Sequence, residues 1–323
     1  MKFSSFARAI VSALFMIAWG PAHAQFPGRA VTLVVPSPQG GATDTGARLV
    51  ASKLTERWGQ AAIVENKPGA SGIVGTEHVA KAKPDGYTLL MGDIGTQAIN
   101  PSLYKNLPYD ANNAFAPVSL VAELPLVLLV HPSVNAKSPR NLIGLAKSKP
   151  GQLAYSSSGS GGSMHLAAVL FESMARVQFF HVPHKGVAPA IADLVAGRVN
   201  LSFATVLESI GEIKAGNVRA LAVTSAQRSP SMPALSTVAE SGVPGYISTS
   251  WIGVLAPAGT PMATVEKIAK DIHRAVTTPD VQHKLIEQGA VPVGSSPAQF
   301  RSLIDSDRRR YARIIQEKKI TAE

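Results

Sequence analysis

Short apolar runs alternate with stretches of helical periodicity along this chain. The run 31–36 (VTLVVP) precedes a helical stretch at 42–58, and a short strand at 61–65 precedes a second helix at 72–82 and a third strand at 87–92. Continuous apolar runs of this length are typical of strands that are buried on both faces. The βαβαβ order predicts an α/β fold with a doubly wound parallel sheet, in which ligands bind where the carboxyl ends of strands meet helix N-termini.

One apolar run does not fit this alternation. Residues 118–131 (VSLVAELPLVLLVH) are too irregular for a helix and too long for an ordinary strand. We interpret this run as a strand that crosses from one lobe to another, and 248–256 as the return crossing. The chain therefore predicts two lobes, each with a doubly wound sheet, that face each other across a cleft and close by hinge motion. The predicted boundaries are 25–122 and 247–323 for lobe 1, and 123–246 for lobe 2.

The first 24 residues have the pattern of a secretory signal peptide. Lys2 and Arg8 precede an apolar core of 11 residues at 9–19, and an A-x-A-like cleavage site follows at 22–24. A membrane anchor would need about 20 apolar residues to span the hydrocarbon layer. The chain contains no cysteine, so no lipid anchor can follow the cleavage site. We expect a soluble mature protein in the periplasm, where NAD and ATP are improbable ligands.

The charge of the chain favours anionic ligands but not nucleic acid. The formal net charge is +10, and +8 once Lys2 and Arg8 are removed with the signal peptide. The basic residues are scattered and form no patch interleaved with aromatic residues, which argues against nucleic-acid binding. The absence of cysteine excludes disulfides and thiolate chemistry.

A loop directly after the first strand has the composition of an anion-binding loop. In 36–44 (PSPQGGATD) two prolines stiffen the chain, and two glycines allow its backbone to approach a ligand closely. The following helix begins here, so free N–H groups and the positive end of the helix dipole suit a carboxylate or a phosphate. The alternative is an ordinary turn that Thr43 or Asp44 caps. The candidate ligand-binding residues of this loop are Ser37, Gln39, Gly40, Gly41, Ala42, Thr43 and Asp44.

A second loop of this kind lies between a strand and a helix of lobe 2. The segment 155–165 (YSSSGSGGSMH) contains five serine hydroxyls and three glycines, and the alternative to a binding loop is a flexible turn. Two such loops across a cleft suggest a ligand with two acidic ends. The candidate residues here are Ser157, Ser158, Ser160, Gly161, Ser163 and His165.

Two further segments contain candidate binding residues. In 181–186 (HVPHKG), Lys185 is placed to pair with an anion and His184 stands beside it, but no third ligand accompanies the two histidines, so we expect no metal site. Thr96 and Gln97 follow the third strand and either line the cleft or have capping and packing roles. We find no G-x-S-x-G, H-E-x-x-H or P-loop motif, so we expect no enzyme. A serine hydrolase that pairs Ser160 or Ser163 with a nearby histidine is the remote alternative.

Several modest motifs occur in an order typical of one family. They include VVPSPQGGATD (34–44), VENKPG (64–69), KPDGYTLL (83–90), AINPSLY (98–104) and APAGTP (256–261). With them the chain resembles the Bug family, the TctC-type substrate-binding proteins of tripartite tricarboxylate transporters, from residue 26 to about 318. The resemblance implies a type II periplasmic-binding-protein fold, a monomer without cofactor or metal, and two lobes that close on a small organic carboxylate. It also implies membrane permease subunits as partners, and a sensor that presents its ligand to a membrane signalling protein is the alternative.

The chain departs from the family pattern at several positions. Ser37 and Gln39 stand where the family often has an aromatic residue and a small residue or proline, and His184 stands where tyrosine is common. Ala204 and Thr205 occupy positions where many members carry aspartate followed by asparagine. An acid at position 204 would neutralise an ammonium group. Its absence predicts a mono- or dicarboxylate without an amine.

Overall fold

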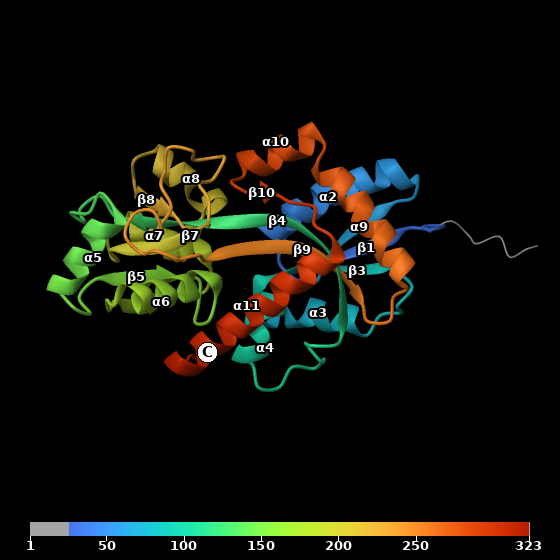
Figure 1. The fold of residues 1–323 in the computed structure, drawn as a ribbon, viewed down its shortest axis with the longest axis horizontal. Helices are drawn as coiled ribbons and strands as arrows, with labels where there is room; N and C mark the ends of the chain where they lie inside the picture. Colours follow the sequence, from blue (N-terminus) through green and yellow to red (C-terminus); the bar gives the residue numbers. More distant parts are fainter. Residues whose placement is uncertain (1–25, 323) are drawn as a thin grey trace, which may run out of the picture.

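The parallel unit predicted at the start of the chain is present in lobe 1 (Figure 1). The computed structural model describes residues 26–322, so the predicted signal peptide lies outside the described residues. The elements of this unit are β1 (Val31–Val35), α2 (Ala42–Trp58), β2 (Ala62–Asn66), α3 (Ile73–Ala80) and β3 (Thr88–Asp93). β1 pairs in parallel with both β2 and β3. α2 covers this sheet because Ala47, Val50 and Leu54 recur on one helical face and are buried.

The predicted crossing is one strand of 16 residues, β4 (Phe115–Val130). Its first part pairs with β9 (Thr249–Pro257), and its second part pairs with strands of lobe 2. Pro125 is the last residue opposite β9, and Leu126 is the first opposite the lobe 2 strands. A proline has no N–H to donate, so this change of partner is a point at which a strand tolerates it.

The sheet is mixed rather than purely parallel, which differs from the sequence prediction. β9 is antiparallel to both β3 and β4, and β4 is antiparallel to its lobe 2 partners. The strand order is β2-β1-β3-β9-β4-β7-β5-β6, with β8 and β10 as additional partners of β4. The return crossing pairs only within the lobe 1 half of this sheet. The two lobes therefore share β4 as their common strand.

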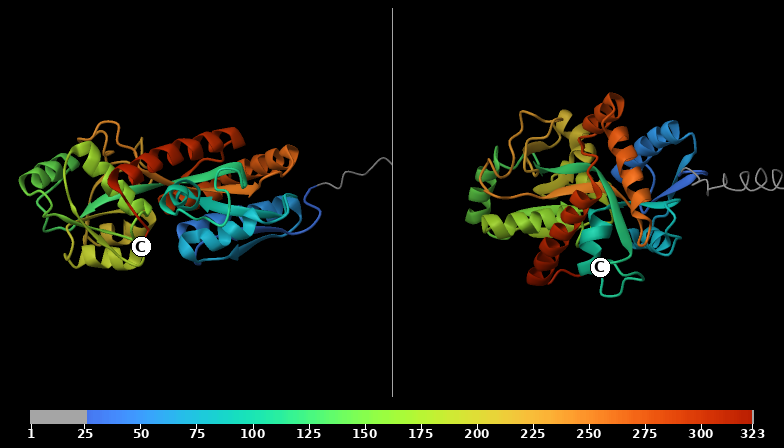
Figure 2. Two further views of the ribbon diagram at one scale, coloured as in Figure 1. Left: turned by 90° about the horizontal axis from the view of Figure 1, so that it is seen from below. Right: turned by 45° about the vertical axis from the view of Figure 1, so that its right-hand side comes forward.

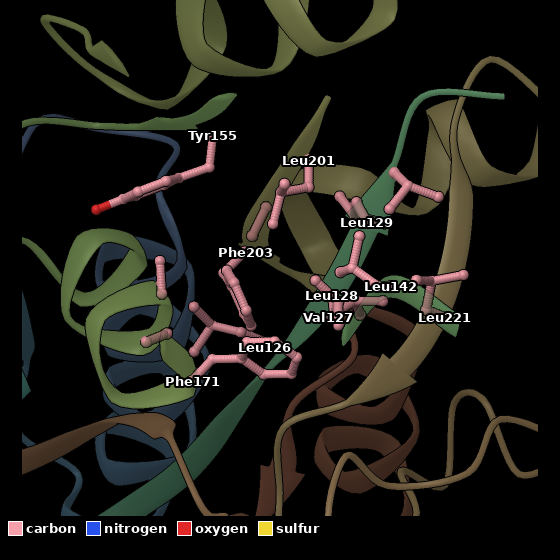
Figure 3. Close-up of a cluster of buried hydrophobic side chains, with 14 of the residues drawn as sticks. Leu126, Val127, Leu128, Leu129, Leu142, Tyr155, Phe171, Leu201, Phe203 and Leu221 are labelled. Atoms are coloured by element: carbon pink, nitrogen blue, oxygen red, sulfur yellow. The ribbon is translucent and has the colours of Figure 1, made fainter. Parts of the chain in front are cut away.

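Lobe 2 repeats the alternation of strands and helices. Its elements are α5 (Pro139–Ser148), β5 (Ala154–Ser157), α6 (Ser163–Ala175), β6 (Phe180–Pro183), α7 (Val187–Val195), β7 (Leu201–Thr205), α8 (Val206–Lys214) and β8 (Arg219–Val223). Side chains of α6 and β7 meet the crossing strand in its core, where Leu126 of β4 lies near Phe171 and Phe203 (Figure 3). The two phenylalanine rings are 5.8 Å apart between centroids. The residues of this core run from Leu126 to Tyr246. The lobe boundaries at 122/123 and 246/247 stay a prediction.

Three helices of the described chain follow the return crossing. They are α9 (Met262–Val276), α10 (Pro279–Glu287) and α11 (Pro297–Lys318). α11 lies across both lobes (Figure 2), and Asp307 on it accepts a 2.8 Å hydrogen bond from the Trp251 indole of β9. The short elements η1 (Ala70–Gly72), η2 (Gly95–Ile99), α4 (Asn100–Leu103) and β10 (Val291–Pro292) were not predicted. In the span 26–322 we find no helix with the length and apolar character needed to cross a membrane.

Candidate ligand-binding site

A cavity of about 650 Å³ lies between the lobes. Its floor consists of the crossing strands, where Leu124 of β4 is paired with Ser250 of β9 and Ile252 lies two residues further along β9. The walls come from one loop of lobe 1 and several helix N-termini of lobe 2. The lining residues are Ser37, Pro38, Gln39, Gly41, Ala42, Thr43, Asp93, Leu124, Ser158, Ser163, Met164, Val187, Ala188, Thr205, Glu208, Ser250 and Ile252.

Three of the helices that begin at this cavity have glycine N-caps. The caps are Gly41 of α2, Gly162 of α6 and Gly186 of α7, and within residues 26–322 no side chain caps any of the three. The first N–H groups of a helix have no partner inside it, and they carry the positive end of its dipole. α8 is different, because Thr205 and Glu208 form a capping box at its start. The cavity therefore combines three helix N-termini that are open to an anion.

Asp44 holds the lobe 1 loop in place from outside the cavity lining. Its carboxylate accepts hydrogen bonds from the Gly40 N–H at 2.9 Å, Arg48 Nε at 3.0 Å and Asn66 Nδ2 at 2.9 Å. Burial opposes its ionisation, but the bonds from Arg48, Gly40 and Asn66 outweigh burial and hold the pKa of Asp44 below its ordinary value. Asp44 thus positions the loop from outside the cavity.

Ser37 places a hydroxyl at the lobe 1 wall of the cavity. Its Oγ is buried and has no hydrogen-bond partner among the described residues. Its carbonyl accepts a 3.1 Å bond from Asn66 Nδ2, the same amide that braces Asp44. A buried hydroxyl without a partner costs free energy, so a polar ligand atom is a favourable neighbour for it.

The serine-rich loop divides into lining residues and supporting residues. Ser158 and Ser163 line the cavity, whereas Ser157 Oγ is bonded to His181 Nε2 at 2.7 Å. His165 Nδ1 accepts a bond from the Gly161 N–H at 2.8 Å, and its ring stacks on His181 at 4.0 Å between centroids. Burial, with a smaller effect of His181, lowers the pKa of His165 to about 3. His165 is therefore neutral near pH 7, and it holds the loop from behind.

The remaining predicted site residues lie outside the cavity lining. His184 Nε2 is 3.5 Å from a carboxylate oxygen of Asp193, and Lys185 is exposed. Thr96 bonds to Asp93, and the Gln97 carbonyl accepts a 2.6 Å bond from Arg308 Nε. Predicted residues that do not line the cavity are Gly40, Asp44, Thr96, Gln97, Ser157, Ser160, Gly161, His165, His184, Lys185 and Ala204.

Ala204 bears directly on the ligand that the sequence predicts. Its side chain is fully buried in the hydrophobic core of lobe 2, opposite Val127 in the sheet. Ala204 itself is thus enclosed in the core and does not line the cavity.

Two carboxyl groups line the cavity, and sequence reasoning missed both. Asp93 ends β3, and Glu208 lies in the first turn of α8. Among the described lining residues there is no lysine, arginine or histidine. Burial raises the pKa of Asp93 in spite of the hydrogen bonds from Thr96 and Gly95. The position of Asp93 at the carboxyl end of a parallel strand was the signal that could have identified it.

Other parts of the surface fit a ligand site less well. A hollow of about 610 Å³ over α7 and α8 shares Val187, Ala188 and Glu208 with the cavity, but lobe 2 alone forms it and its lining is mostly aliphatic. Among residues 26–322, no three His, Cys, Asp or Glu side chains are grouped closely enough to hold a metal ion. The interlobe cavity is therefore the candidate site.

Comparisons with known proteins agree with this architecture. A family model described as "Tripartite tricarboxylate transporter family receptor" matches residues 46–320. A relative from Pseudomonas sp. strain P51, the UPF0065 protein in the tcbD-tcbE intergenic region, is 40% identical over 92% of this chain and 88% of its own length.

Two solved structures are similar over nearly the whole described chain. R. palustris Rpa4515 with adipate has a TM-score of 0.81 and 38% identity, and covers 92% of this chain and 99% of its own. MatC from Rhodopseudomonas palustris with bound malate has a TM-score of 0.76 and 31% identity, and covers 90% of this chain and 100% of its own. These findings confirm the resemblance and the two-lobed fold predicted from the sequence. The chain belongs to the TctC family of periplasmic receptors of tripartite tricarboxylate transporters.

Proposed function

We propose that this protein captures a small mono- or dicarboxylic acid in the interlobe cavity and delivers it to the membrane permease of a tripartite transporter. The observation that carries the proposal is the convergence of three helix N-termini, without side-chain caps, on one cavity lined by both lobes. Backbone N–H groups and helix dipoles hold a carboxylate without a cationic side chain. The adipate and malate in the two similar structures support the same ligand class.

The cavity supports binding rather than catalysis. A serine hydrolase needs a histidine that takes a proton from the serine hydroxyl. His165 follows the serine-rich loop, but its Nδ1 is occupied by the Gly161 N–H and its lowered pKa makes it a weak base. His184 lies outside the cavity lining and faces Asp193.

We place the working protein in the periplasm, after removal of the first 24 residues. The sequence pattern of those residues and the family's receptor role support this location. A receptor of this kind encloses its ligand between the lobes, and its closed form would be the one that the permease recognises. β4 is shared by both lobes, so a change of angle between them would be taken up at this strand and at β9.

The experiment is thermal unfolding of the purified protein with adipate, succinate, malate, aspartate, benzoate and glucose. A ligand that is present at about 100 times its Kd stabilises the folded state by about 2.7 kcal/mol, which raises Tm visibly. We expect a rise with carboxylates and none with glucose. A rise with glucose alone would contradict the proposal, as would the absence of any rise in protein first unfolded and refolded to release a bound ligand.

A further inference from the structure

Asp93 is an acidic side chain in a cavity otherwise suited to anions. It is the last residue of β3, lies opposite Ile252 of β9 in the sheet, and lines the cavity near its floor. Asp93 is absent from the ion pairs of the described residues. Arg308 is a half-buried cation that donates to the Gln97 carbonyl, the Ala111 carbonyl and the Asn112 side chain. Its guanidinium does not form an ion pair with Asp93. Asp93 therefore has no cationic partner among the residues that the structure describes.

The carboxyl group of Asp93 is held in a fixed orientation. Its Oδ1 accepts a 2.8 Å bond from the Thr96 N–H and a 3.0 Å bond from Thr96 Oγ1. Thr96 Oγ1 also accepts a bond from the Asp93 N–H at 3.1 Å, so the two residues form a closed local network. Both of these bonds end on Oδ1, and the Gly95 N–H also donates to the carboxyl group. A carboxyl that is oriented in this way is preorganised for a ligand group.

The other lining carboxyl group has a structural role. Glu208 Oε2 accepts bonds from the Thr205 N–H and hydroxyl, at 3.1 and 2.7 Å, and closes the capping box of α8. Its side chain is exposed at the cavity rim, where water screens its charge. Asp93 is thus the carboxyl group that a bound ligand must accommodate.

Taking the proposed function as given, we propose that Asp93 selects a ligand whose carbon chain carries a hydrogen-bond donor, a hydroxyl or an ammonium group, next to a carboxylate. An unsubstituted dicarboxylate would bring negative charge to this half-buried carboxyl group without offering it a hydrogen-bond donor. A donor on the ligand would satisfy Asp93 while the helix N-termini hold the carboxylates. The ligand class is then 2-hydroxy or 2-amino carboxylates.

The test uses matched ligands that differ in one group. Titration calorimetry compares adipate with 2-hydroxyadipate and 2-aminoadipate, and succinate with malate and aspartate. A ligand that cannot make one hydrogen bond to a charged group should bind about tenfold more weakly, or worse, than a ligand that makes it. We expect one substituted acid of each series to bind at least about tenfold more tightly than its unsubstituted analogue. The arm that shows this preference identifies the donor as hydroxyl or ammonium.

The variant Asp93→Asn assigns the preference to this residue. Its amide oxygen can keep the two bonds from Thr96, which turns the NH₂ group toward the ligand. An ammonium preference should then disappear, a hydroxyl preference should shrink, and the unsubstituted acid should bind at least as well as before. Asp85→Asn is the matched control, because it removes the same charge near the opposite end of β3, and it should keep the wild-type ratio.

Three results would overturn the inference. The first is equal affinity of the wild-type protein for substituted and unsubstituted acids. This comparison uses no variant, so it does not depend on whether Asp93→Asn folds. The second is a folded Asp93→Asn that keeps the wild-type preference. In both cases the acids still bind, so the proposed function stands. The third is the absence of binding by any acid, which removes the proposed function and this inference together.

Discussion

Replacing Gly41 with valine tests whether the N-terminus of α2 holds the ligand. Gly41 is the N-cap of α2 and lines the cavity, with φ −77° and ψ 171°. Valine adopts this extended conformation readily, and a Cβ at this position has no heavy atom within 4 Å. The fold should therefore tolerate Gly41→Val, with a change in unfolding free energy of about 1 kcal/mol or less, because only the modest preference of N-caps for glycine over valine is lost.

The expected effect on binding is much larger. The valine side chain would stand in the space through which a carboxylate reaches the first N–H groups of α2. A hydrogen bond to a charged group contributes about 1.5–3 kcal/mol, and about 1.4 kcal/mol corresponds to a tenfold change in affinity. Loss of one such bond should weaken the binding of adipate by about tenfold to a hundredfold. Gly41→Ala, with a smaller side chain, should have an intermediate effect.

Calorimetric titration gives Kd, and thermal unfolding without ligand gives stability. Gly40→Val is the matched control, because Gly40 has φ +85° and lies outside the cavity lining. A left-handed residue with a side chain costs about 1–2 kcal/mol, so this control should lose stability, whereas Gly41→Val should lose affinity. A folded Gly41→Val protein with wild-type Kd for the ligand found by screening would refute the assignment of α2 to the site.

Three further changes separate stability from binding. Ser163→Asp places a negative charge at the start of α6, so it should stabilise the helix by about 0.3–1 kcal/mol yet weaken carboxylate binding at least tenfold. The uncharged control Ser163→Asn should bind the carboxylate better than the aspartate variant. Equal Kd values for the two variants would argue against a role of the α6 N-terminus in binding. Asp44→Ala should lower stability in urea unfolding at pH 7. Because the pKa of Asp44 is lowered in the folded state, its contribution to the free energy of unfolding is present above its unfolded pKa and is lost as pH falls through the folded value. A loss of stability in Asp44→Ala that is as large at pH 2 as at pH 7 would contradict this explanation. His165 has a folded pKa of about 3 against 6.5 for the free side chain, so stability should fall as pH drops from 6.5 toward 3, while the unfolded state takes up a proton that the folded state excludes. His165→Asn should lessen this fall in urea unfolding between pH 7 and 4, and an unaltered pH profile would show that His165 does not cause it.

Most helices and strands of this chain were predictable within a few residues. α2 begins and ends at the residues that the sequence pattern predicts, and α6 and α11 begin with the same kind of local signal. Their boundaries are set locally, by a glycine or serine before the first turn and by the spacing of apolar side chains. The turn at η2 and the short α4 were not predicted, because each is too short to show a repeating pattern of apolar residues.

The pairing of strands was not predictable in the same way. β9 and β4 are apolar runs like the parallel strands, yet β9 pairs antiparallel to both β4 and β3. An apolar run shows that a strand is buried on both faces, but its direction depends on where the chain returns after more than a hundred residues. A purely parallel sheet was therefore the natural prediction, and the mixed sheet is a tertiary result.

The sequence by itself determined the family, the two lobes and the two glycine-containing loops that contribute to the cavity lining. These features depend on residue types at neighbouring positions, which local chemistry restricts. Tertiary structure decided which side chains of those loops face the cavity, why Asp44 and His165 support it from outside, and why Ala204 is enclosed in the core. It also brought Asp93 to the cavity floor beside β9. The side of a strand or loop that meets a ligand depends on contacts between segments far apart in the chain, and no local pattern records them.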